Sequence, residues 1–209
     1  MTVKTYIFIF LLTCLFGGSL LAEPDEKSSA SREYKIKAAF IYNFLKTVEW
    51  PKEFISDSNE SMVVGIIGKD PFGDAFEPII GKVVKGKKVV VTRLKGLSQI
   101  DKRSDNSDSR SEIDIETMRK CHLLFVCSSE QRTFMEIIKS VDGYSVLTVG
   151  EIKNFLEAGG VINFIPQAEK GDFEINLSAS KRAKLNISSK LLRIAKRVIE
   201  EESSGKETG

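Results

Sequence analysis

Hydrophobic residues recur at helical spacing near the start of the chain and in short, unbroken runs further along it. From Glu33 onward, apolar side chains return every three or four positions, which predicts an amphipathic helix. This helix is expected to end near Trp50, because Pro51 disfavours helical backbone in the residue before it. Residues 62–67 then form a β-branched run that ends at Gly68, the pattern of a strand buried on both faces.

The rest of the sequence alternates between short apolar runs and helical patterns. Further strands are expected at residues 87–94, 123–126, 146–149, 161–165 and 172–177. Helices are expected at residues 70–81, 113–120, 128–138, 151–157, 179–184 and 188–199. Strands that alternate with helices favour a parallel sheet, since parallel strands need crossover connections. The sequence therefore predicts a single-domain α/β fold, with a mixed, mainly parallel sheet flanked by helices on both faces and an antiparallel hairpin at one edge.

Three segments are too polar to join this core. Residues 23–32 are expected to form a linker and residues 201–209 a flexible tail. Residues 98–112 mix charged side chains with serines, which predicts a solvated insertion. The predicted domain spans residues 33–200.

Residues 1–22 have the layout of a signal peptide. Lys4 is the single charge before Glu23, and an apolar stretch leads to small residues that end at Ala22. The alternative is a retained anchor, but glycine, serine and threonine dilute the stretch, and a spanning helix needs roughly 20 apolar residues. We expect cleavage, a periplasmic location and no stable membrane insertion of the mature chain.

Composition places the remaining chain among soluble globular domains. The hydrophobic and charged fractions are 42% and 29%, and the formal net charge of the whole chain is +2. The length suits one domain with one core. A chain this close to neutral has no strong positive field to attract a phosphate backbone, so no nucleic-acid partner is expected.

Cysteine and histidine are poorly placed for a reactive site. Cys121 and Cys127 bracket a predicted strand, which holds them about 20 Å apart, whereas a disulfide needs Cα atoms within about 7 Å. We interpret both as buried apolar side chains, and the alternative is an intermolecular disulfide. His122, the single histidine, is expected to point to the strand face opposite Cys121, which argues against a nucleophile–base pair and against a zinc site.

The glycines around the first predicted strand do not form a phosphate-binding loop. Gly65, Gly68 and Gly73 have the spacing of neither common loop motif. Asp70 would also repel a phosphate at this turn. No catalytic residue, cofactor or metal ligand is therefore expected.

Aromatic and polar side chains are better candidates for a function. Tyr42 and Trp50 add aromatic surface to the end of the first predicted helix, and such side chains are enriched at binding surfaces. Asn163, Glu174 and Asn176 lie on the predicted edge hairpin, and an exposed edge strand is a docking surface. We interpret these residues as partner contacts. Core packing is the alternative for the two aromatic residues.

Seven motifs in the same order resemble the YfiR-like family over residues 33–198. The first is YKIKAAFIYNF at 34–44, which leads to VEWP at 48–51. The others are GKDPFG at 68–73, CHLLF at 121–125, VLTVG at 146–150, GGVINF at 159–164, FEIN at 173–176 and SSKLL at 188–192. The resemblance thus covers nearly the whole predicted domain.

This resemblance implies a periplasmic α/β domain, often dimeric, without known enzymatic activity. The best-understood members repress an inner-membrane diguanylate cyclase by binding its periplasmic sensor part, which limits cyclic-di-GMP synthesis and biofilm formation. Some relatives use disulfides, which the cysteines here cannot close locally. Two alternatives stay open: a small-ligand binding protein with a pocket near Gly68 to Gly73, and a thiol-dependent enzyme that uses Cys121 or Cys127.

Overall fold

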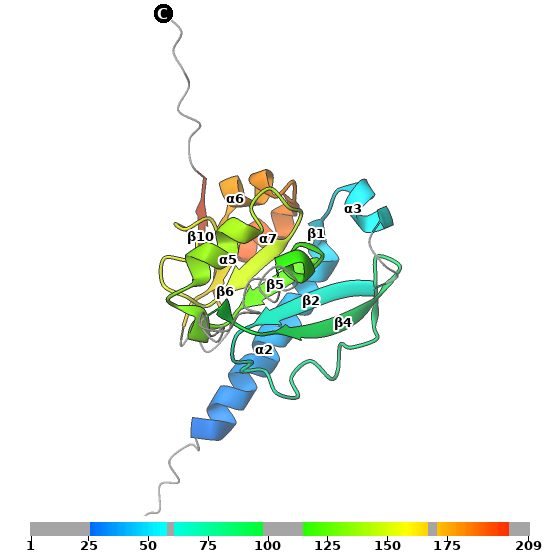
Figure 1. Cartoon of the computed structure of the whole chain (residues 1–209). Helices are drawn as coiled ribbons and strands as arrows, with labels where there is room; N and C mark the ends of the chain where they lie inside the picture. The colour runs from blue at the N-terminus through cyan, green and yellow to red at the C-terminus, as the bar shows by residue number, and fades with distance from the viewer. Residues whose placement is uncertain (1–25, 58–60, 98–114, 167–170, 201–209) are drawn as a thin grey trace, which may run out of the picture. The chain divides into compact units, whose positions relative to one another are not determined.

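A computed structural model shows the arrangement of the chain (Figure 1). It describes residues 26–57, 61–97, 115–166 and 171–200. The predicted signal peptide, polar insertion and tail lie outside these ranges. The chain divides into residues 1–30 and 31–209, and the second unit contains the sheet.

A mixed, mainly parallel sheet forms the centre of the second unit. Its described strands lie in the order β10-β8-β7-β6-β5-β2-β4-β3. Their bounds are β2 Ser61–Ile67, β3 Val83–Val84, β4 Lys87–Leu94, β5 Leu123–Val126, β6 Leu147–Gly150, β7 Ile162–Phe164, β8 Phe173–Asn176 and β10 Arg197–Ile199. Neighbours are antiparallel at β7–β8 and β3–β4 and parallel elsewhere. The predicted α/β fold class is confirmed.

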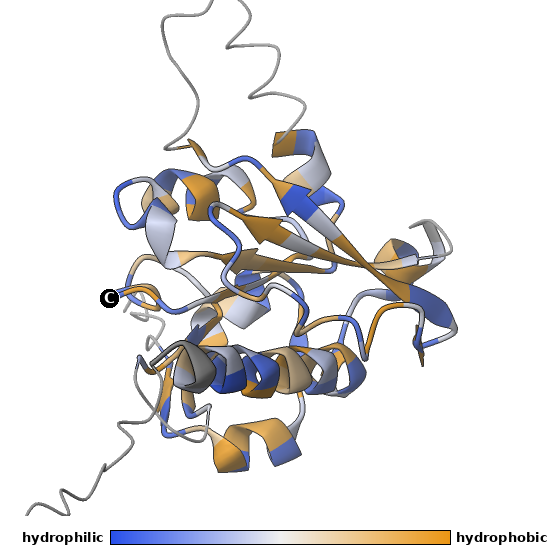
Figure 2. Cartoon of the chain, turned by 90° about the horizontal axis from the view of Figure 1, so that it is seen from below, coloured by the Kyte–Doolittle hydropathy of each residue, from blue (hydrophilic) through white to orange (hydrophobic). Residues whose placement is uncertain are grey.

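Helices cover both faces of this sheet, because successive strand residues point to opposite sides. On one face, Leu123 and Phe125 belong to a core with α2 (Glu26–Thr47), α6 (Leu177–Arg182) and α7 (Ser189–Ile194). On the other face, Leu124 and Val126 pack with α5 (Phe134–Ser140) and the helix at 115–119. Hydrophobic residues accordingly gather in the central strands, whereas the helices alternate between the two colours (Figure 2).

The first helix differs from its prediction at both ends. It begins at Glu26, so that the stretch 26–32, expected to be linker, is helical. It ends at Thr47 because the next two residues form β1 (Val48–Glu49), which pairs with β9 (Asn186–Ile187) in a small antiparallel sheet. A further short helix, α3 (Lys52–Asp57), follows Pro51.

Two predicted helices, at 70–81 and 151–157, are wrong. Both segments are series of turns, with backbone bonds such as Ile79 N–H to Phe76 O that span three residues. Left-handed backbone interrupts each of them, at Gly73 (φ 53°) and at Asn154 (φ 63°). The predicted helix at 128–138 is also divided, into the 3₁₀ turn η3 (Ser128–Glu130) and α5.

Both edges of the main sheet differ from expectation. The hairpin β7–β8 is not at the edge, because β10 pairs with β8 where the sequence predicted a continuation of the last helix. The opposite edge is β3, which the pattern analysis missed. Its two-residue turn, Lys85-Gly86, has positive φ at both positions, the geometry of a tight β-hairpin.

Candidate functional sites

The carboxyl ends of β2 and β5 meet at the place where doubly wound sheets bind ligands. The chain passes from β4 on one side of β2 to β5 on the other, which makes a topological switch point. Here Glu130 is completely buried and accepts hydrogen bonds from Thr133 Oγ1 (2.9 Å) and Ser129 Oγ (3.3 Å). A Cβ on Gly96 would lie 1.9 Å from Glu130 Oε1. The carboxylate of Glu130 therefore fills this crevice.

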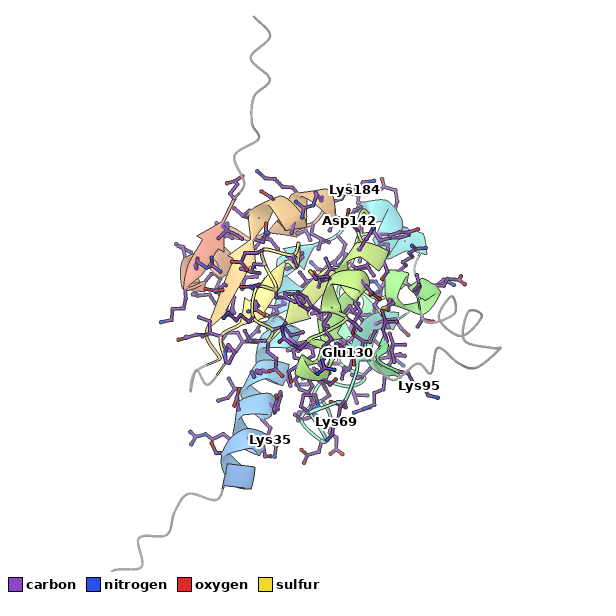
Figure 3. All side chains as sticks on the ribbon, turned by 60° about the vertical axis from the view of Figure 1, so that its left-hand side comes forward. Lys35, Lys69, Lys95, Glu130, Asp142 and Lys184 are labelled. Carbon is purple, nitrogen blue, oxygen red and sulfur yellow. The ribbon has the colours of Figure 1, made fainter. Side chains whose placement is uncertain are left out.

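This arrangement argues against the ligand pocket expected near Gly68 to Gly73. A Cβ on Gly68 would lie 2.5 Å from Ser129 Oγ and 2.9 Å from Glu130 Oε1. Figure 3 shows Glu130 toward the end of the molecule that carries Lys69 and Lys95, whereas Lys184 is at the opposite end. A phosphate-bearing ligand at the switch point would meet a buried carboxylate.

A buried ionic cluster connects α2 to the loop after β6. Lys37 Nζ lies 2.5 Å from Glu151 Oε2 and 2.5 Å from Glu33 Oε1, and Tyr34 Oη donates to Glu151 Oε1 at 2.8 Å. The Lys37 and Glu151 side chains are 3% and 6% exposed. Burial and the negative charge of Glu151 raise the pKa of Tyr34 well above its usual range, so the phenol stays a donor. The cluster fixes α2 on the sheet.

A pocket of about 820 Å³ lies at the other end of the sheet, before the amino ends of β2, β5 and β6. This volume is within the usual range for small-molecule sites. Its lining residues are Pro51, Glu53, Phe54, Ser61, Val63, Thr92, Thr117, Arg119, Lys120, His122, Ser145 and Lys184.

His122 is a buried, neutral part of this wall. Its Nδ1 accepts a hydrogen bond from the Val63 N–H (3.1 Å), which places the proton of the neutral ring on Nε2. Its ring makes edge contacts with Trp50 and Phe54. Burial, with repulsion from Lys87 as the second cause, lowers the pKa of His122 to about 4.

Neither Cys121 nor Cys127 has the surroundings of a nucleophile. Both Cys121 and Cys127 are free and buried, which confirms their interpretation as core side chains. Burial raises the pKa of Cys121 to about 12, and burial raises that of Cys127 with help from Asp70. Cys121 Sγ donates to Thr117 O, whereas Nδ1 of the adjacent His122 accepts from Val63 N–H. These contacts argue against the thiol-enzyme hypothesis.

The predicted aromatic contacts have different environments. Trp50 is buried, and its Nε1 donates to His122 O at 3.2 Å, so the indole connects the residue after β1 to the start of β5. Tyr42 is half-buried, with Lys46 Nζ and Lys82 Nζ at 5.5 and 5.4 Å from its ring centroid. Tyr42 thus presents partly accessible surface next to β3.

The predicted polar contacts form internal bonds. Asn163 accepts from Ile152 N–H (3.0 Å), and Asn176 caps α6 and donates to Leu156 O (2.8 Å). Both asparagines are buried, and they hold the loop between β6 and β7. Glu174 pairs with Arg197 on β10. The structure brings Asn163 and Glu174 together across β7–β8 and leaves Trp50 at a separate place, against the start of β5.

Sequence reasoning missed Glu130, the Lys37–Glu151 pair and the pocket. The pattern contained one signal for the pair: Lys37 lies four residues before Ile41 and seven before Phe44, on the apolar face of α2. A lysine at such a position needs a buried acidic partner. The acid and the pocket residues come from distant segments, and the sequence spacing does not bring them together.

The described residues offer neither a metal-binding cluster nor a membrane-spanning helix. No group of three or more histidine, cysteine, aspartate or glutamate side chains in the described ranges is arranged to hold a metal ion. Within the same ranges, no helix has both the length and the apolar character needed to cross a membrane.

Comparison with known proteins identifies the family. A comparison with curated proteins gives no significant match. A crystal structure of a conserved domain protein from Vibrio cholerae O1 biovar El Tor aligns with a TM-score of 0.45 and 12% identity over 79% of this chain and 60% of the other. The chain thus spans less than two thirds of that protein. The sequence profile of the YfiR/HmsC-like family matches residues 34–196, almost the complete predicted domain. The chain therefore belongs to the YfiR/HmsC-like family.

Proposed function

We propose that this protein represses an inner-membrane diguanylate cyclase by contact with its periplasmic sensor part, which limits cyclic-di-GMP synthesis and biofilm formation. The observation that carries this proposal is the family match over residues 34–196. The proposed mechanism is preferential binding to the inactive cyclase. A binding protein shifts such an equilibrium only by its difference in affinity for the two states.

The best-placed surface for this contact includes Tyr42 and the edge strand β3. We define the Tyr42–Val83 surface as Tyr42, Ile80, Lys82 and Val83. Ile80 and Val83 are 50% and 62% exposed, and Lys82 lies over the Tyr42 ring. An edge strand offers backbone donors and acceptors to an added strand.

Charge indicates what kind of segment fits there. Lys82 and Lys85 flank β3, and Lys87 and Lys88 begin β4. Lysines protect a sheet edge against unspecific pairing, and they favour a partner that carries acidic residues. The proposed partner segment is therefore an extended stretch of the sensor part with acidic and apolar side chains.

Replacing Val83 with glutamate is expected to abolish repression, because it adds a negative charge at the centre of the proposed contact. The matched control is Met135→Glu on α5, since Met135 is also 62% exposed but does not belong to the Tyr42–Val83 surface. Both substitutions remove an exposed apolar side chain, so neither is expected to shift the unfolding free energy by more than about 0.5 kcal/mol.

Cyclic-di-GMP is measured in a deletion strain that carries the wild-type gene, Val83→Glu or Met135→Glu. We expect the deletion to raise cyclic-di-GMP severalfold, Met135→Glu to restore the low level, and Val83→Glu to leave it high. An unchanged level in the deletion strain would refute the proposed function. Full complementation by Val83→Glu would leave the function and refute the contact surface.

A further inference from the structure

The pocket at the amino end of the sheet has a strong bias toward positive charge. Its wall carries the cations Arg119, Lys120 and Lys184 and the acid Glu53. Arg119 and Lys120 lie at the end of the helix at 115–119, and Lys184 lies in the turn after α6. Cations that converge on one cavity from separate elements favour an anion there.

Arg119 is held in place before any ligand arrives. Its Nε donates to Ser140 O at 2.8 Å, and its guanidinium lies 4.4 Å from the centroid of the Tyr144 ring. The bond to Ser140 occupies one donor of a fork that has five, and the Nη groups carry the others. A fixed guanidinium loses little conformational entropy when it binds an anion.

The other two cations differ in their local partners. Lys120 Nζ lies 2.6 Å from Glu116 Oε1, in an exposed helix pair of the kind that contributes little. Lys184 has left-handed backbone (φ 57°) and is exposed at the pocket rim. This conformation directs the chain after α6 back toward β9 and places a lysine at the pocket.

The remaining lining combines hydroxyl groups with an apolar wall. Four hydroxyl side chains line the pocket and suit the oxygens of a carboxylate or phosphate; they are Ser61, Thr92, Thr117 and Ser145. Pro51, Phe54 and Val63 supply the apolar part. A ligand with both an anionic group and an apolar body would satisfy the two halves together.

We infer that this pocket binds a small organic anion, a carboxylate or phosphate group attached to an apolar body. The anionic group lies among Arg119, Lys184 and the hydroxyls, and the body lies against Pro51 and Phe54. Trp50 precedes Pro51 and donates to His122 O, so a molecule that lies against Pro51 contacts the segment that follows α2 and β1. A role for the ligand in releasing the cyclase rests on the proposed function, whereas the binding itself does not.

The test uses the intrinsic fluorescence of Trp50, the sole tryptophan, together with calorimetric titration of the purified mature chain. The probes are benzoate and phenyl phosphate, and benzamide is the uncharged analogue. We expect both anions to bind at least tenfold more tightly than benzamide, with an affinity that falls as salt is added.

Lys184→Glu is expected to weaken binding of both anions by at least tenfold. The matched control is Lys85→Glu: Lys85 is also exposed and left-handed (φ 52°), but it lies in the β3–β4 turn and does not line the pocket. This control is expected to stay within twofold of wild type. Equal binding of benzamide and benzoate, no binding of the anions at millimolar concentration, or equal losses in the two variants would overturn the inference. Because no cyclase is present, none of these results bears on the proposed function.

Discussion

Replacing Lys37 with methionine is expected to lower the free energy of unfolding by about 3–5 kcal/mol, because it leaves a buried carboxylate without its cation. Glu151 would keep the hydrogen bond from Tyr34, but it would lose the charge that lies 2.5 Å from its Oε2. Methionine is close to lysine in length and is apolar, so the lost packing is small. The measurement is equilibrium denaturation in urea, with the midpoint and slope compared between variants.

The same helix offers the control. Lys35→Met removes a lysine whose side chain is 57% exposed and whose nearest carboxylate, on Asp74, is 3.9 Å away. We expect this variant to stay within about 0.5 kcal/mol of wild type. The double variant Lys37→Met/Glu151→Leu is expected to recover most of the lost stability, since no buried charge is left alone. Equal effects of Lys37→Met and Lys35→Met would show that the buried pair does not fix α2.

Acidification is expected to destabilise the protein through His122. The pKa of this buried ring is lowered from 6.5 to about 4, so between these values the unfolded chain binds a proton that the folded chain does not. The contribution of His122 to stability is therefore complete above about pH 6.5 and is lost as the pH falls toward 4. Each pKa unit corresponds to roughly 1.4 kcal/mol, which gives about 3 kcal/mol over the whole interval.

The variant His122→Asn isolates this contribution from that of the carboxylates. An asparagine Oδ1 can take the place of Nδ1 as acceptor for the Val63 N–H, and it does not titrate. The difference in unfolding free energy between wild type and variant is measured from pH 7.5 to pH 4. We expect the unfolding free energy of wild type, relative to that of His122→Asn, to fall by about 3 kcal/mol over this range. A difference that does not change with pH would mean that His122 keeps its ordinary pKa in the folded protein.

The central strands were predicted closely because their sequences carry the full signal. Strand β4 has the predicted bounds, β5 matches as well, and β2 begins one residue earlier. Strands with helices on both faces need apolar residues on both, so that they read as unbroken runs with little ambiguity. The α/β class followed from their alternation with helical segments.

The turns at 70–81 and 151–157 were mistaken for helices because their apolar spacing is almost the same. Buried Phe76 and Ile79 are three residues apart, which suits both an α-helix and a series of three-residue turns. The left-handed residues Gly73 and Asn154 decide the outcome, and the pattern gives them little weight. Strand β10 was missed because its pairing depends on β8, more than twenty residues away in sequence.

The candidate contacts were harder to predict, since exposure depends on the complete fold. Trp50 can be buried because its indole N–H donates to His122 O. Asn163 can be buried because its Oδ1 accepts from Ile152 N–H. These partners are not recognisable from local sequence. Tyr42, which has partly accessible surface, is the predicted contact that the structure makes most useful for a partner-binding proposal.

The side chain of Glu130 restricts which ligands can bind at the switch point of the sheet. In folds of this topology, a nucleotide phosphate commonly binds at the position that the Glu130 carboxylate occupies in this chain. A domain whose own carboxylate occupies that position is poorly suited to bind cyclic-di-GMP there, and under the proposed function its signals would reach it through its outer surface or through the pocket at the opposite end of the sheet. Under the proposed function, such a protein would regulate the synthesis of a nucleotide that it does not itself bind.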